Sequence, residues 1–396
     1  MKISDRVSKI AESATLAITT LARSMRAEGK KIIPFSAGEP DFDTPACIRE
    51  AAKKAIDDGY TRYTPTTGLP ELKKAICHKF ESENSLMYKP DQIIVSCGAK
   101  HSLFNAILAL CEEGDEVLLP VPYWVTYLEQ IALAGATPVP VYCRQDTLEV
   151  EPDALRESIT PRTRVLVLNN PVNPTGVVYS EKTLAEIAEL SLQHDITIIS
   201  DEIYEHLVYD QKPPPSIASL DPEMGKRTIV VNGVSKTFAM TGWRIGYSAG
   251  PYDAVQAMSR LQDHTTSNPT TISQIAAQAA LQCPQEIIQS MVETFNRRRT
   301  LMSTLMNALP DVSFPFPRGA FYIFADFSAY LGKYFCGNLL NSSFDLAQKL
   351  LREAGVACVP GSAFGMEGFL RFSYATSEDN IETGMKQLRS FLENLT

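Results

Sequence analysis

The middle of this chain alternates short runs of β-branched residues with stretches of helical periodicity. Such alternation is typical of a mostly parallel sheet whose two faces are covered by helices. Helices are expected over 99–110, 180–194 and 271–281. The last strand follows its predecessor closely along the chain, which makes it a candidate for antiparallel pairing. The expected strands cover residues 92–96, 116–120, 137–142, 164–168, 197–200, 228–231 and 244–249.

A different pattern begins near Pro284. A long polar helix over 285–309 leads to short strands over 321–326 and 370–373, and a helix is expected over 343–354. These elements indicate a smaller α+β unit, which we expect the N-terminal segment to complete. The chain therefore divides into an N-terminal arm that forms part of the small domain (1–45), a large ligand-binding domain (46–290) and a small C-terminal domain (291–396).

Charge and hydropathy exclude several classes of partner. The formal net charge is -9, from 37 Lys and Arg against 46 Asp and Glu, whereas nucleic-acid and membrane-surface binding need extended positive fields. No run of about 18 apolar residues is present, so no membrane span is expected. The amphipathic start of the chain lacks the apolar core of a signal peptide. We expect a cytoplasmic protein with neither nucleic-acid nor membrane partners.

Cysteine and histidine spacing gives no sign of a metal site. The eight cysteines are scattered, with no CxxC pair and no histidine at ligand spacing. The five histidines are isolated from one another. We therefore expect reduced, mostly buried thiols and no bound metal.

Polar residues gather where the expected strands end. In open α/β sheets, ligands bind beyond the carboxyl ends of the strands. Nearly every one of these strand ends carries a group that could take part in binding or catalysis. We interpret these groups as parts of a single site. The residues concerned are Gly98-Ala99-Lys100, Tyr123-Trp124, Asn170 to Asn173, Asp201 to Tyr204, and Ser235-Lys236.

Lys236 is the strongest candidate for a nucleophile. It follows an apolar strand directly, Arg244 comes eight residues later, and Asp201 and Tyr204 lie one strand earlier. A lysine that is partly desolvated and close to another cation has a lowered pKa and can form a Schiff base. Pyridoxal phosphate also needs an acid at its ring nitrogen, a donor at its phenolic oxygen, a ring stack and a phosphate cup.

Four ordered motifs carry a family resemblance. They are NPVNPTG at 170–176, SDEIY at 200–204, SKTFAMTGWRIG at 235–246 and RFSYA at 371–375. With SAGEPDFDTP at 36–45 and YTPTTGLPELK at 63–73, the chain resembles the class I pyridoxal-phosphate-dependent aminotransferases of fold type I over nearly its whole length. Within them it is most similar to the bacterial aspartate aminotransferase subgroup. The resemblance implies a mostly parallel seven-stranded sheet in the large domain, beside a small α+β domain built from both termini.

The resemblance implies a role for each matching residue around the cofactor ring. Lys236 would form the Schiff base with pyridoxal 5'-phosphate and later move the substrate α-proton. Asp201 would pair with the ring nitrogen, Tyr204 and Asn173 would hydrogen-bond the phenolic oxygen, and Trp124 would stack on the ring.

The phosphate would be held by the backbone amides of Ala99 and Lys100 at a helix N-terminus, with the Arg244 guanidinium beside them. Tyr63 would reach the phosphate of a neighbouring subunit, which implies a homodimer with shared active sites. The sequence departs from the family pattern at Gly233, where many relatives have a serine that contacts the phosphate.

Arg371 would bind the substrate α-carboxylate as a planar fork, and Gly38 would offer a backbone amide to the same group. Lys100 would meet the distal carboxylate of an acidic substrate, and Trp124 and Asn173 would complete the pocket. The resemblance therefore implies reversible amino transfer from L-aspartate to 2-oxoglutarate, giving oxaloacetate and L-glutamate by a ping-pong mechanism.

Several alternatives remain open from the residues alone. The same scaffold could act on prephenate and glutamate, on aromatic amino acids or on alanine, or, less favourably, as a C–S lyase. A regulatory protein with an aminotransferase-like domain would need a DNA-binding segment. A dehydrogenase would need GxGxxG, which the SCGAKHS segment lacks. Singly, each site residue also has a structural interpretation: a solvated loop (Lys236, Lys100), a helix cap (Asp201), a turn (Asn173), a core aromatic (Trp124) or a surface ion pair (Arg371).

Overall fold

Seven strands form one mixed sheet at the centre of the computed structural model, which describes residues 1, 3–8, 10 and 14–396. Five positions of the expected N-terminal arm lie outside the described residues. The strand order is β1-β7-β6-β5-β4-β2-β3. β7 is antiparallel to both of its neighbours, as the sequence indicated, and the other observed pairings are parallel. The bounds are β1 Ile93–Ser96, β2 Glu116–Val121, β3 Thr137–Tyr142, β4 Thr163–Asn169, β5 Thr197–Asp201, β6 Thr228–Gly233 and β7 Gly246–Ala249.

The start of β7 differs from the expected strand, which began at Arg244. Arg244 has a φ of 56°, in the left-handed region, and it follows a short 3-10 turn over Thr241–Trp243. An extended strand cannot include this conformation, so β7 begins two residues later.

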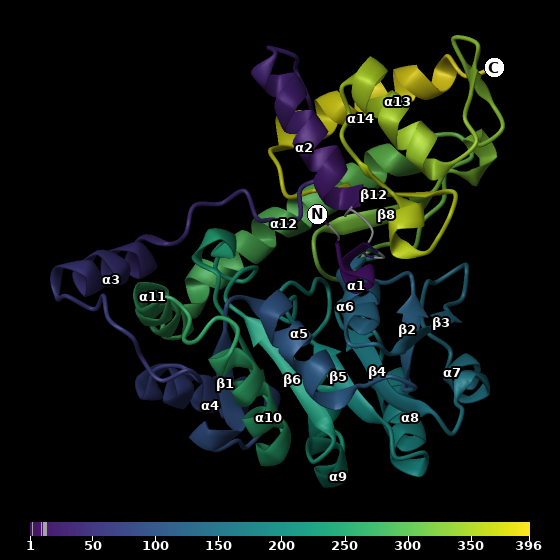
Figure 1. Ribbon diagram of the computed structural model, residues 1–396. Coiled ribbons are helices and arrows are strands. Elements are labelled where there is room, and N and C mark those ends of the chain that lie inside the picture. The colour runs from purple at the N-terminus through teal and green to yellow at the C-terminus, as the bar shows by residue number, and fades with distance from the viewer. Residues whose placement is uncertain (2, 9, 11–13) are drawn as a thin grey trace.

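Helices cover both faces of the sheet (Figure 1). Val165 and Val167 of β4 pack in the cluster that contains α5, α6 and α10, whereas Leu166 and Leu168 pack against α7 and α8. This alternation follows from the two-residue period of a strand. Further along the sheet, α4 and α11 cover β1, β6 and β7. The helices around the sheet are α3 Ala46–Asp57, α4 Pro70–Asn84, α5 Ala99–Leu110, α6 Thr126–Leu133, α7 Pro152–Ser158, α8 Glu181–Gln193, α9 Pro222–Gly225, α10 Tyr252–Asp263 and α11 Thr271–Leu281.

A second, smaller sheet lies above the first in Figure 1. Its order is β11-β12-β8, with antiparallel pairing, and β9 and β10 form a separate hairpin. None of the described helices has both the length and the apolar character needed to cross a membrane. The remaining bounds are α1 Asp5–Ser8, α2 Ala14–Ala27, α12 Gln285–Asn307, β8 Tyr322–Asp326, β9 Tyr334–Phe335, β10 Asn338–Leu339, α13 Ser343–Ala354, β11 Val359–Pro360, β12 Phe369–Ser373 and α14 Glu378–Glu393.

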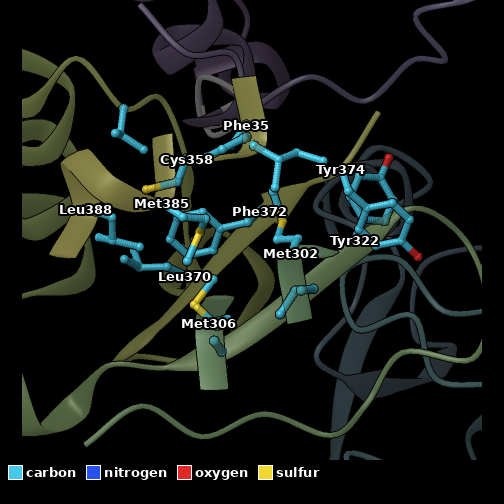
Figure 2. Packing of buried hydrophobic residues seen from close by; sticks show 14 of the residues in the cluster. Phe35, Met302, Met306, Tyr322, Cys358, Leu370, Phe372, Tyr374, Met385 and Leu388 are labelled. Carbon is cyan, nitrogen blue, oxygen red and sulfur yellow. The ribbon is translucent and has the colours of Figure 1, made fainter. Parts of the chain in front are cut away.

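The N-terminal segment packs into this smaller layer. Ile33 forms a parallel bridge with Val356, and the Ser373 amide donates to the Phe35 carbonyl oxygen at 2.7 Å. Figure 2 shows the fully buried Phe35 beside side chains from α12, α14 and β12, including Met302 and Phe372. The exact division at residues 45 and 290 stays a prediction.

Helix α12 connects the two layers. It begins beside α11 and runs beneath the small sheet (Figure 1). Its buried Arg298 pairs with Asp41 at 2.6 Å, and Arg299 pairs with Asp210. Both ion pairs hold α12 to residues that lie in loops.

Candidate active site

A cavity of about 280 Å³ lies at the carboxyl ends of β4, β5 and β6, where the large sheet meets β8 and β12. The residues to which the resemblance gave a role all line this cavity, except Tyr63. Gly98, Tyr123 and Asn170, which were expected at the site from their places after strands, do not line it. The Tyr63 side chain is 92% exposed in the loop between α3 and α4. Ile203 and Ser235, from the expected strand ends, also line the cavity, together with residues that the sequence did not single out, namely Leu103, Tyr127, Asn169 and Tyr322.

Lys236 lies in the turn that follows β6, with its amine inside the cavity. Its Nζ donates to the Gly38 carbonyl oxygen at 2.6 Å and lies 5.9 Å from the Tyr204 ring centre. Burial lowers the pKa of Lys236 to about 8; nearby Glu39 opposes this shift, while Arg371 and Arg244 assist it. A substantial neutral fraction is therefore present near pH 7 to 8, as a nucleophilic amine requires.

Asp201 is the last residue of β5 and is 3% exposed. Burial raises the pKa of Asp201 to about 6, although hydrogen bonds from the Tyr127 hydroxyl and the Ile203 amide stabilise its ionised form. The Tyr127 hydroxyl donates to Asp201 Oδ2 at 2.6 Å. Asp201 is thus predominantly a carboxylate at neutral pH, and it can pair with a protonated ring nitrogen.

Aromatic side chains form the cavity walls. The Tyr204 and Tyr322 hydroxyls lie 3.0 Å apart, and burial raises the pKa of both side chains. Lys100 Nζ lies 5.0 Å from the Trp124 ring centre, and both residues also line the cavity. Burial and the neighbouring Arg244 lower the pKa of Lys100.

Arg371 enters the cavity from β12 and is 2% exposed. Its Nη1 donates to Asn173 Oδ1 at 2.9 Å, its Nη2 donates to the Ser36 carbonyl oxygen at 3.2 Å, and its guanidinium stacks 4.3 Å from the Tyr322 ring centre. Its Nε is buried with no hydrogen-bond partner among the described residues. A buried cation with an unused donor is suited to a carboxylate, which it can bind as a fork.

Two glycines allow an anion cup to form at the start of α5. A Cβ at Gly98 would lie 2.6 Å from Arg244 Nη2, and a Cβ at Gly246 would lie 2.1 Å from the Ala99 nitrogen. Side chains at these positions would push Arg244 and the helix terminus apart. Their absence leaves the first amides of α5 and a guanidinium close together, a combination that binds phosphate.

Gly233, where the family resemblance implies a serine, does not line the cavity. A Cβ at this position would lie 3.0 Å from both the Gly246 Cα and the Ile245 carbonyl oxygen. Because these neighbours are backbone atoms, a serine would require them to move. The groups available for an anion cup are therefore Arg244 and the α5 terminus, and position 233 offers no side chain to it.

Tyr127 and Tyr322 are the main site residues that sequence reasoning missed. Tyr322 belongs to an apolar strand and Tyr127 to a helix, so both resemble core residues. The only available signal for Tyr127 was its position three residues after Trp124, on the same strand-to-helix connection.

The cavity fits pyridoxal 5'-phosphate. The glycine cradle suits a phosphate, a buried carboxylate is available for the ring nitrogen, and a partly neutral lysine is available for the aldehyde. Trp124 offers an aromatic face of suitable size. When bound, this cofactor supplies an electron sink for a substrate carbanion.

Comparison with known proteins agrees with this fit. The family model for aminotransferase class I and II matches residues 30–388. An aspartate aminotransferase from Geobacillus stearothermophilus is 44% identical over 99% of both chains. An aspartate/prephenate aminotransferase from Cereibacter sphaeroides is 44% identical over 100% of this chain and 99% of its own. The crystal structure of an aspartate aminotransferase from Rhizobium meliloti superposes with a TM-score of 0.95, at 42% identity and full coverage of both chains.

The fold, the cavity and these full-length matches lead to one conclusion. The chain belongs to the class I and II aminotransferases and is a pyridoxal-phosphate-dependent enzyme of class I.

Proposed function

We propose that this enzyme is an aspartate aminotransferase, which transfers the amino group of L-aspartate to 2-oxoglutarate. The observation that carries this proposal is the pair of cations that line one cavity, Arg371 from the small sheet and Lys100 from the large domain. A dicarboxylate offers one carboxylate to each cation. The names of the relatives support the same substrate class.

Each residue's part in the reaction follows from its position. Arg371 binds the α-carboxylate through its unused Nε and an Nη group, while Asn173 and the Ser36 carbonyl fix the guanidinium. The Lys236 amine, with its lowered pKa, takes the α-proton and returns it. Lys100 holds the distal carboxylate.

Other residues hold the cofactor and exclude water. Asp201 pairs with the ring nitrogen and is kept ionised by Tyr127. Tyr204 and Asn173 bind the phenolic oxygen, Trp124 covers the ring, and Ala99, Lys100 and Arg244 hold the phosphate. Tyr322 closes the side of the cavity next to Arg371.

Prephenate is a second candidate amino acceptor. It also carries two carboxylates, and Lys100 selects for a second carboxylate without fixing what joins it to the first. The Cereibacter sphaeroides relative is named for both substrates.

We further propose that the enzyme is a cytoplasmic homodimer. Tyr63 is 92% exposed and lies outside its own cavity, which supports a role in a neighbouring subunit's phosphate site. Sedimentation equilibrium measures the subunit number. Weaker cofactor retention in Tyr63→Phe, measured by dialysis, tests the shared site.

Steady-state rates with aspartate, alanine, tyrosine and cystathionine test the substrate. We expect the highest kcat/KM with aspartate, and no transamination of aspartate would refute the proposal. Lys100→Met should lower kcat/KM for aspartate by about 10- to 150-fold, because a charged hydrogen bond of about 1.5–3 kcal/mol is lost, while the value for alanine changes little. The Lys236→Ala variant should fold and lose the long-wavelength absorbance of the bound cofactor.

A further inference from the structure

Two cysteines that are 236 positions apart in the sequence meet at the surface of the large domain. Cys47 Sγ and Cys283 Sγ lie 2.8 Å apart. A disulfide bond is about 2.05 Å long, so the two sulfurs need to approach by less than about 1 Å to form one. Cys47 is the second residue of α3, and Cys283 lies between α11 and α12.

The surroundings give the two thiols different accessibility. Cys47 is exposed, whereas Cys283 is partly buried. Burial, together with the adjacent Cys47 thiol, raises the pKa of Cys283 to about 12. Cys283 therefore stays protonated near neutral pH as long as the side chain of Cys47 is a thiol. Because Cys47 is the more exposed of the two, a reagent in solution reaches its sulfur first.

We propose that Cys47 and Cys283 form a reversible oxidation site whose co-reactant is a low-molecular-weight disulfide. The Cys47 thiolate attacks one sulfur of the reagent and releases one thiol, which leaves a mixed disulfide on Cys47. Cys283 then loses its proton and attacks the Cys47 sulfur, which forms the intramolecular bond and releases the second thiol. Two cysteine thiols are oxidised, the reagent is reduced to two thiols, and the two cysteine protons end on those thiols.

Cys47 lies on the segment that follows Gly38, a residue that lines the active-site cavity. The Thr44 hydroxyl donates to the Ala239 carbonyl oxygen at 2.7 Å and accepts from the Trp243 indole at 3.0 Å. Asp41 pairs with Arg298 of α12. The segment from Asp41 to Cys47 is therefore held against α12 near one end. The new bond would fix its other end to Cys283, two residues before the start of α12.

The other cysteines have no comparable geometry. Two of the eight cysteines are buried, four are partly exposed and two are exposed, so the expectation of mostly buried thiols was wrong. Cys336 is exposed in the turn between β9 and β10, which makes it a matched control for a surface thiol. Among the described residues, Cys47 and Cys283 are the cysteine pair with a sulfur–sulfur contact.

The test is incubation of the reduced, cofactor-loaded enzyme with glutathione disulfide, followed by alkylation, trypsin and mass spectrometry. The tryptic peptides 32–49 and 261–297 each contain one cysteine. We expect them joined, with a mass loss of about 2 Da that dithiothreitol reverses. We also expect the thermal unfolding midpoint to rise on oxidation, because the bond closes a long loop.

Three variants complete the test. Cys47→Ser and Cys283→Ser should each abolish the joined peptide and the rise in unfolding midpoint, and Cys283→Ser should retain a glutathione adduct on Cys47. Cys336→Ser should behave like the unaltered chain. Stable glutathionylation of Cys47 in the unaltered chain, with no joined peptide, would overturn the proposal. A joined peptide that links other cysteines would do the same.

Discussion

We predict that Tyr127 controls the pH range over which the apo-protein binds its cofactor. Its hydroxyl donates to Asp201 Oδ2 at 2.6 Å. In the proposed function, Asp201 has to be ionised to pair with the ring nitrogen. Tyr127→Phe removes this donor and keeps the ring. A hydrogen bond to a charged group contributes about 1.5–3 kcal/mol, and 1.36 kcal/mol corresponds to one pKa unit. The pKa of Asp201, which is about 6 in the intact chain, should therefore rise by about 1 to 2 units.

The assay is titration of apo-protein with pyridoxal 5'-phosphate at a series of pH values, followed by absorbance or tryptophan fluorescence. The affinity should weaken as the pH falls through the pKa of Asp201, and in Tyr127→Phe this transition should occur about 1 to 2 pH units higher. Above both transitions the two proteins should bind similarly.

Two controls separate this effect from general damage. Tyr179 is a buried tyrosine in a different cluster, so Tyr179→Phe should leave the transition unchanged. Asp201→Asn should remove the transition. If Tyr127→Phe folds normally and its transition stays within about 0.3 unit of the original, the assignment of Tyr127 to Asp201 ionisation is refuted.

Three further changes have defined outcomes. Arg371→Lys loses the planar fork and the contact with Asn173, so kcat/KM for aspartate should fall about 100-fold, or about 2.7 kcal/mol, in steady-state assays. In the apo-protein, Lys236→Met should raise the free energy of unfolding at pH 7 by about 1–3 kcal/mol in urea titrations, because burial opposes the charged amine. The sign follows because the folded-state pKa of about 8 lies below the ordinary 10.5: the unaltered chain gains stability as the pH rises from 8 towards 10.5, and the variant should lack this gain. Gly233→Ser should destabilise by about 1–3 kcal/mol, since its Cβ meets the Gly246 backbone; tighter binding of the cofactor by this variant, with unchanged stability, would contradict the steric argument.

Much of the fold was predictable because its periodicities are local. Helices α5, α11 and α13 have the bounds expected from the sequence, and so does β3. The start of β7 was not predictable, because the left-handed backbone of Arg244 depends on its contacts with Thr241 and the residues before α5. A non-glycine residue gives no local sign of that conformation.

The candidate site was predictable where polar groups follow strands, and less so where tertiary contacts define the function. Asp201 ends β5 and Lys236 follows the end of β6 by three residues, so the sheet topology brings them together. Tyr127 and Tyr322 resemble core aromatics until the fold places a carboxylate beside one and a guanidinium beside the other. The contact between Cys47 and Cys283 depends entirely on the packing of distant segments.

The positions of Lys100 and Arg371 have a consequence for how the enzyme distinguishes dicarboxylate substrates of different chain length. Lys100 belongs to the large domain and Arg371 to the small sheet, so no single loop or helix sets the distance between them. The distance between Lys100 and Arg371 depends on how the two layers pack against each other and on α12, which connects them. Aspartate and glutamate differ by one methylene. Whether the enzyme accepts both substrates therefore depends on how far the packing between the two layers lets the distance between Lys100 and Arg371 change. Substitutions along α12, remote from every reacting atom, are therefore where an engineer should look to retune chain-length preference.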